Sequence, residues 1–180
     1  MKKIILNLAV SLDSFIEGPN GEIDWCIMDE DMDFDAFLNS VDTLFYGRVS
    51  YDAWGNYLPQ ENADESEKAF WQSIHAKNKY VFSRSEQISG NATLINTDLA
   101  SKVAAIKAQP GKDIWLYGGA NLIKTFISMS LIAEYRISVH PVVLGSGKPL
   151  FEDIAARTNF KLFSTRTFRS GVVELIYKPE

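Results

Sequence analysis

IWLYGGANLIKTF, residues 114–126, joins a strand-like pattern to a helix-like one at a pair of glycines. The apolar run ends at Gly118 and Gly119, and apolar residues at helical spacing begin immediately afterwards. Glycine tolerates backbone conformations and close approaches that a Cβ atom would forbid. The junction therefore has two readings: a tight turn, or a seat where a bulky anion meets the backbone at a helix N-terminus. Taken alone, the two glycines favour the turn.

The same alternation of strand and helix patterns extends through most of the chain. Short, branched apolar runs predict strands, and apolar residues three or four positions apart predict helices. The predicted strands cover residues 3–10, 42–47, 79–85, 92–96, 113–119 and 133–145. The predicted helices cover residues 29–40, 48–55, 63–78, 97–109 and 120–130. Two further strand patterns, 159–168 and 171–179, flank turn residues 169–171 and predict a C-terminal hairpin.

This order of elements predicts an α/β fold. Helices that alternate with strands cover both faces of a mainly parallel sheet, which gives three layers, αβα. The C-terminal hairpin should add antiparallel strands at one edge, so we expect a mixed sheet. Pro141 predicts an edge position or a bend in the strand at 133–145. No stretch of residues 1–180 has the composition of a linker, and we expect a single domain.

Charge and cysteine content restrict the classes of partner. The net charge is −5 and no basic cluster is visible, which argues against nucleic acid as a partner. The single cysteine, Cys26, excludes an intrachain disulfide, and the spacing of Cys and His residues predicts no metal site. The N-terminal apolar run is broken by Asn7 and lacks a cleavage pattern, so we interpret it as a strand and not as a signal peptide. No run is long enough to span a membrane, and we expect a cytoplasmic protein.

Polar residues and glycines follow three of the predicted strands at the point where each strand ends. These are GRVS at 47–50, SRS at 83–85 and GGAN at 118–121. In an open α/β sheet, ligands bind beyond the carboxyl ends of the strands, and those ends meet at one edge. Arg48 and Arg84 could each bind phosphate oxygens there. The sequence has neither GxGxxG nor GxxxxGK[ST], which argues against a standard Rossmann site and a P-loop.

Five stretches together carry a resemblance to a known family. They are LAVSLDSFIEGPNGEIDW (8–25), DTLFYGRVSYDAW (42–54), YVFSRS (80–85), IWLYGGANLIKTF (114–126) and HPVVLGSGKPLF (140–151). In this order they resemble the dihydrofolate reductase-like superfamily. The resemblance is nearest to the reductase domain of the bifunctional deaminase–reductase of riboflavin biosynthesis. It implies the stand-alone form of that domain, without the zinc deaminase module.

The resemblance implies an NADPH-dependent reductase, and it assigns cofactor roles to residues of this chain. Those expected at the cofactor phosphates are Gly47, Arg48, Val49, Ser50, Ser83, Arg84 and Ser85. Those expected along the pyrophosphate are Gly118, Gly119, Ala120, Asn121 and Leu122, with a peptide bond between the two glycines that is often cis in this family. Those expected beside the nicotinamide are Ala9, Val10, Ile16 and Gly18. If Arg84 meets a 2′-phosphate, NADPH is preferred over NADH.

Two carboxylates are candidate catalytic residues, since reduction of a C=N or C=O bond usually needs a proton donor or an orienting group. Asp13 follows the first strand in SLDS, which resembles the SLDG of riboflavin-type reductases; the alternative is an ordinary turn aspartate. Asp31 lies where folate reductases carry their pocket acid; the alternative is an acidic helix start facing solvent. Trp25 could stack on a flat heterocycle or belong to the core.

Two departures from the family pattern bear on the substrate. Ser14 replaces the glycine of SLDG, and Tyr117 stands where riboflavin-type enzymes tend to have an acidic residue. We expect a reductase of a small heterocyclic substrate resembling 5-amino-6-(5-phosphoribosylamino)uracil. Dihydrofolate reduction and a non-catalytic nucleotide-binding protein are the alternatives. The resemblance also implies a homodimer.

Overall fold

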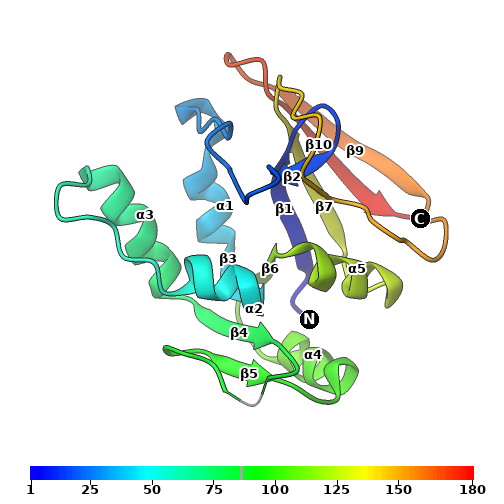
Figure 1. The fold of residues 1–180 in the computed structure, drawn as a ribbon. Helices are drawn as coiled ribbons and strands as arrows, with labels where there is room; N and C mark the ends of the chain where they lie inside the picture. The colour runs from blue at the N-terminus through cyan, green and yellow to red at the C-terminus, as the bar shows by residue number, and fades with distance from the viewer. Residues whose placement is uncertain (86) are drawn as a thin grey trace. The chain divides into compact units, whose positions relative to one another are not determined.

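The computed structural model describes residues 1–85 and 87–180, drawn as a ribbon in Figure 1. The chain divides into two compact units. Unit 1 comprises Met1–Lys3 and Phe34–Gly119, and unit 2 comprises Ile4–Asp33 and Ala120–Glu180. The chain therefore begins in unit 1, enters unit 2, returns to unit 1 at Phe34 and leaves it after Gly119. The second crossing falls inside the stretch GGAN.

Unit 1 holds four parallel strands with helices between them. The strands are β3 (Val41–Gly47), β4 (Asn78–Phe82), β5 (Thr93–Ile95) and β6 (Asp113–Gly118), in the order β5-β4-β3-β6. The helices are α1 (Phe34–Ser40), α2 (Arg48–Ser50), the π-helical η2 (Tyr51–Gly55), α3 (Glu65–His75) and α4 (Leu99–Ala108). Consecutive residues Leu44, Phe45 and Tyr46 of β3 are all fully buried. This is expected of a central strand covered on both faces.

Unit 2 holds a mixed set of strands and one longer helix. The main strands are β1 (Ile4–Val10), β7 (Glu134–Val139), β9 (Phe160–Thr167) and β10 (Val173–Pro179), in the order β1-β7-β10-β9. β1 pairs with β7 in parallel, whereas β10 pairs with both of its neighbours antiparallel. The other elements are β2 (Phe15–Glu17), η1 (Glu30–Met32), α5 (Ala120–Ser128) and β8 (Lys148–Pro149).

The fold class predicted from the sequence is confirmed: an α/β protein with a mainly parallel mixed sheet of eight strands and an antiparallel C-terminal hairpin. The hairpin strands β9 and β10, orange and red in Figure 1, run side by side. The prediction that residues 1–180 form a single domain stays a prediction.

Two local predictions were wrong in detail. The helix predicted at 29–40 is broken, because Asp33 has a positive φ of 52°, and the α-helical part starts at Phe34. The strand predicted to continue to residue 145 ends at Val139, before His140 and Pro141. Proline has no N–H and disfavours continuation, and β7 lies between β1 and β10, so Pro141 marks a bend and not an edge.

The sequence also gave no sign of β2 and β8, which pair antiparallel as a separate two-stranded sheet. Leu150 donates its N–H to the Ser14 carbonyl at 2.9 Å and continues the link between these segments. The pair is too short and too interrupted to show a strand period. It connects the loop after β1 to the segment that follows Gly147.

Candidate functional site

Three turns of unit 1 lie at the carboxyl ends of adjacent strands. Gly47–Ser50 follows β3, Ser83–Ser85 follows β4, and Gly118–Gly119 ends and follows β6. The register pairs Gly47 with Phe82 and Tyr46 with Gly118, so the three strands end at one level. We call these three turns the strand-end cluster. The peptide bond between Gly118 and Gly119 is cis, as the resemblance implied.

In the part of the chain that the structure describes, no side chain caps the first turn of α2. Gly47 is the N-cap residue and has no side chain to accept from the N–H groups of Arg48–Ser50. A Cβ atom placed on Gly119 would lie 3.0 Å from Ser50 Oγ, so the second glycine leaves room beside this turn that alanine would reduce. Val49 is 83% exposed and projects to solvent. A backbone donor set next to a glycine-lined space is the chemistry that a phosphate requires.

The two arginines of the strand-end cluster differ in what they already bind. Arg48 donates through Nε to Asp52 at 2.6 Å and through Nη1 to the Gln87 carbonyl at 2.5 Å. Arg84 is exposed and has no ion-pair or hydrogen-bond partner among residues 1–85 and 87–180. Ser83 Oγ accepts from the Ser85 N–H at 3.1 Å, which shapes the turn around Arg84. Arg84 therefore has the more available guanidinium for an anionic ligand.

In unit 2, the loop after β1 is held by one carboxylate. Ala9 and Val10 end β1, and the Asp13 carboxylate accepts hydrogen bonds from Ser11 Oγ at 2.6 Å, Gly145 N–H at 2.7 Å and Leu144 N–H at 3.1 Å. The Ser11 hydroxyl is the largest influence on the pKa of Asp13; with the two backbone donors it outweighs the effect of burial and lowers that pKa below 3.8. A carboxylate in this state is an acceptor that ties two loops together.

Ile16 and Gly18 continue from this anchored loop. Ile16 lies in β2, and the buried Gly18 donates its N–H to the Glu22 carbonyl at 2.9 Å and opens the following turn. A Cβ atom on Gly18 would clash with the Glu22 carboxylate. Ser11 N–H donates to the Phe15 carbonyl at 2.9 Å, so this loop stays close to the end of β1. Unit 2 thus brings together Ala9, Val10, Asp13, Ile16 and Gly18.

Trp25 packs against a buried histidine. The Trp25 ring meets His140 edge to face, with centroids 5.4 Å apart and an interplanar angle of 84°, and its Nε1 donates to the Glu22 carbonyl at 3.1 Å. Both ring nitrogens of His140 face carbonyl oxygens, Ser138 at 3.0 Å and Ile27 at 3.3 Å. These contacts fix the position of the half-buried Trp25, whose ring is edge-on to His140.

Asp31 lies in η1 with an exposed side chain. Its carbonyl accepts from Arg166 Nη2 at 3.0 Å, and the nearby Asp29 carboxylate accepts from the Ser170 N–H at 3.1 Å. The hairpin end of unit 2 therefore holds this acidic segment by its backbone and by Asp29. The exposed carboxylate of Asp31 itself matches the solvent-facing alternative of the sequence interpretation.

Ala120, Asn121 and Leu122 form the first turn of α5. Asn121 is exposed, whereas Leu122 is buried with 7% exposure. The Leu122 side chain belongs to the core of unit 2, so only its backbone N–H could meet a ligand.

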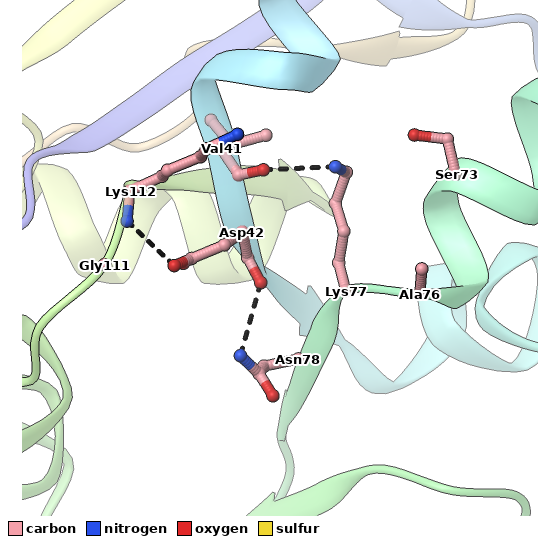
Figure 2. Close-up of a pocket in the computed structure, with 8 residues that line it drawn as sticks. All are labelled: Val41, Asp42, Ser73, Ala76, Lys77, Asn78, Gly111 and Lys112. Carbon is pink, nitrogen blue, oxygen red and sulfur yellow. Dashed lines mark hydrogen bonds between the residues drawn. The ribbon is translucent and has the colours of Figure 1, made fainter.

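A separate pocket of about 440 Å³ opens in unit 1 at the opposite ends of the same strands (Figure 2). Lys77 donates to the carbonyls of Leu38 and Val41 at 2.8 and 3.1 Å, and Lys112 Nζ donates to the Asn39 carbonyl at 2.7 Å. These lysines cap the carboxyl end of α1 and the start of β3. Because its cations are already bound to carbonyls, we interpret this pocket as structural. Ligands of open α/β sheets belong at the carboxyl ends.

Sequence reasoning missed several side chains around these clusters. Tyr46, Tyr51 and Tyr117 gather beside the strand-end cluster, with ring centroids 5.7 Å apart for Tyr46–Tyr51 and 4.7 Å apart for Tyr46–Tyr117. Ser11 and His140 anchor the loops of unit 2. A tyrosine in a strand looks like any core aromatic, so the only available signal was its position next to a glycine turn.

No group of three or more metal-ligating side chains occurs in the part of the chain that the structure describes. Over the same residues, no helix combines the length and apolar character needed to cross a bilayer.

The strand order and the mainly parallel mixed sheet define an α/β protein with the dihydrofolate reductase-like fold. Dihydrofolate reductase from Enterococcus faecalis, solved in complex with NADP(H), aligns with a TM-score of 0.68 and 11% identity, covering 99% of this chain and 96% of that one. The sequence matches the RibD C-terminal domain family over residues 2–174. The chain belongs to this family, which confirms the resemblance to a reductase of the riboflavin pathway.

Two further relatives cover nearly the whole chain. "Uncharacterized protein YyaP" of Bacillus subtilis (strain 168) is 56% identical over 177 residues, which is 98% of this chain and 94% of that protein. A putative riboflavin biosynthesis protein from Shewanella sp. PV-4 has a TM-score of 0.79 at 23% identity, covering 100% of this chain and 99% of that one. At this identity the structural likeness establishes the fold alone.

Proposed function

We propose that this protein is an NADPH-dependent reductase of a small heterocyclic substrate resembling 5-amino-6-(5-phosphoribosylamino)uracil. Membership of the RibD C-terminal domain family supports the reaction class. The observation that supports the cofactor is the strand-end cluster, in which β3 and β6 end in glycines, β4 ends at Ser83–Ser85, and the Arg84 guanidinium is available to an anion. The fold by itself would not support the assignment of a cofactor, because one fold hosts many functions.

The residues of this cluster fit a dinucleotide phosphate. The N–H groups of the α2 first turn and the space beside Gly119 would receive phosphate oxygens, and Arg84 would bind a 2′-phosphate. Ser83 and Ser85 shape the turn that presents Arg84. NADPH bound there would supply the hydride. The resemblance assigns Ala120–Leu122 to the pyrophosphate, and Ala9, Val10, Ile16 and Gly18 to the nicotinamide.

On the substrate side, we assign Asp13 a positioning role and not that of a general acid. Its three hydrogen bonds and lowered pKa keep the carboxyl group ionised, so it would position the loop after β1 and would not donate a proton. Asp31 has an exposed carboxylate and is the remaining acid among the residues assigned to the site. Trp25, held by His140, would border the substrate.

The anchored state of Asp13 favours one alternative, a nucleotide-binding protein on the same fold that does not turn over. In this arrangement both oxygens of Asp13 accept hydrogen bonds, so the carboxylate holds no proton to give to a substrate. Dihydrofolate reduction has weaker support, because it depends on Asp31 as a pocket acid. The cytoplasmic location and the homodimer remain predictions from the sequence.

Two measurements test the proposal. Titration with NADPH, followed by nicotinamide fluorescence, should give saturable binding that is tighter than for NADH; no binding would reject every reductase reading. Oxidation of NADPH is then compared with the phosphoribosylaminouracil and with dihydrofolate as substrates. Turnover of the first supports the proposal, and turnover of dihydrofolate alone replaces it. Tight NADPH binding without turnover of either identifies the non-catalytic alternative.

A further inference from the structure

The Tyr46 hydroxyl is a buried donor that has no hydrogen-bond partner in the described part of the chain. Tyr46 has 0% exposure, and its hydroxyl is the one buried side-chain polar atom that lacks a hydrogen bond among the residues described by the structure. Buried polar groups in folded proteins are almost always hydrogen-bonded, and an unpaired one destabilises the fold. Phenylalanine would fill the same space without this cost. The hydroxyl therefore needs an explanation beyond packing.

The position of Tyr46 points to the strand-end cluster. The residue is directly followed by Gly47, the N-cap of α2, and it pairs with Gly118 in the register of β3 and β6. Its ring lies 4.7 Å from that of Tyr117, which precedes Gly118, and 5.7 Å from that of Tyr51, which follows Ser50. The Tyr46 ring thus contacts both the residue that precedes the glycine turn and the residue that follows the helix turn.

The three tyrosines are not equivalent. Tyr51 donates its hydroxyl to Asn56 Oδ1 at 3.2 Å, so its polar group is satisfied within the fold. Burial, with smaller contributions from Tyr117 and Tyr51, raises the pKa of Tyr46 well above its ordinary value. Tyr46 therefore stays protonated over the working pH range and is able to donate a hydrogen bond.

We propose that the Tyr46 hydroxyl donates a hydrogen bond to an oxygen atom of the dinucleotide when that ligand occupies the strand-end cluster. Tyr46 would then be a binding residue whose donor is unsatisfied until the ligand arrives. No solvent reaches the hydroxyl in the free protein, so an acceptor can reach it only when neighbouring side chains move. This inference rests on the proposed function, since it requires a dinucleotide at this edge.

The test compares Tyr46→Phe with Tyr51→Phe, measuring the melting temperature of the free protein and the Kd for NADPH. Tyr46→Phe should leave the melting temperature unchanged or raise it by up to about 4 °C, because an unpaired polar group is removed. It should weaken NADPH binding by about tenfold. Tyr51→Phe, which removes a satisfied hydroxyl, should lower the melting temperature and change the Kd by less than about twofold.

Two results would overturn the inference while leaving the proposed function intact. One is a Tyr46→Phe variant that binds NADPH as the wild type does. The other is a Tyr46→Phe variant with a lower melting temperature, which would mean that the hydroxyl is already bonded in the free protein, for example to a buried water. Failure of the wild type to bind NADPH would reject the proposed function and this inference together.

Discussion

The polar groups at the two ends of β3, β4 and β6 differ in how far they are already hydrogen-bonded. At the amino ends, Asp42 accepts from Lys2 Nζ at 2.5 Å, from Thr43 Oγ1 at 2.7 Å and from the Lys112 N–H at 2.8 Å. At the carboxyl ends, neither the α2 turn nor the Tyr46 hydroxyl has a side-chain partner among residues 1–85 and 87–180. A satisfied network contributes stability, whereas uncommitted donors next to glycines are suited to a ligand. The comparison separates groups that hold unit 1 together from groups available for binding.

The largest expected effect is on stability, and it comes from Asp42→Ala, which removes the centre of the hydrogen-bonded network at the amino ends of the strands. The Lys2 side chain is only 3% exposed, so its ammonium would keep Thr43 Oγ1 as a partner but lose its countercharge. We expect a loss of about 3 kcal/mol in unfolding free energy. For a chain of this size, that corresponds to a fall in melting temperature of about 6 to 12 °C. Thermal unfolding measures it, and NADPH affinity should not change.

The matched control for this variant is Glu65→Ala, which removes an exposed ion pair with Lys68 and should be nearly neutral. A pH series adds a second check. Burial raises the pKa of Asp42, but the hydrogen bonds from Lys2, Thr43 and Lys112 outweigh it and lower the pKa below 3.8. The stability that Asp42 contributes is therefore present above this value and is lost as the pH falls through the lower folded-state pKa. A difference from Asp42→Ala that disappears near neutral pH would contradict this assignment.

Arg84→Ala tests whether the carboxyl ends of the strands bind the cofactor. Since Arg84 is exposed, its loss should leave the melting temperature unchanged. NADPH affinity should fall by about 10- to 100-fold through loss of a charge-assisted hydrogen bond, with little change for NADH. Parallel fluorescence titrations measure both ligands, and Arg157→Ala, at another exposed arginine, serves as the control. Equal losses for NADPH and NADH would mean that Arg84 does not contact a 2′-phosphate.

Asp13→Asn has the smallest expected effect, a modest change in melting temperature. It tests whether a fully hydrogen-bonded group in unit 2 behaves like those of unit 1. Asp13 follows the carboxyl end of β1, yet its oxygens are fully engaged, so it should behave like the satisfied groups of unit 1. The asparagine amide turns one acceptor into a donor facing Leu144 or Gly145, and we expect a lower melting temperature, by less than for Asp42→Ala. Its lowered pKa means that the contribution is present above pH 3.8 and is lost in more acidic solution.

The pH dependence of turnover distinguishes the two possible roles of Asp13. As a positioning residue it should change the rate without removing a titration from the pH profile. A profile that loses its acidic limb in Asp13→Asn would restore Asp13 as the proton donor.

Hydrophobic periodicity and turn residues were enough to predict most of the helices and strands. The turn residues 169–171, which predicted the hairpin of β9 and β10, illustrate why, since such signals lie within a few residues of each other. The break at Asp33 and the pairing of β2 with β8 were missed, because a left-handed residue and a two-residue strand leave no period in the sequence.

For the site, the sequence by itself determined which donors and glycines stand at the strand ends: Gly47–Ser50, Ser83–Ser85 and Gly118–Gly119 each follow directly from a local pattern. Only the tertiary structure decided which of these groups remain uncommitted. Arg48 is bound by Gln87, thirty-nine residues away, and Asp13 by Gly145, at a separation of 132. The Tyr46 hydroxyl has no hydrogen-bond partner among the residues that the structure describes. The reason is physical: a residue type fixes what a side chain can donate or accept, whereas satisfaction depends on partners that only folding brings within hydrogen-bond distance.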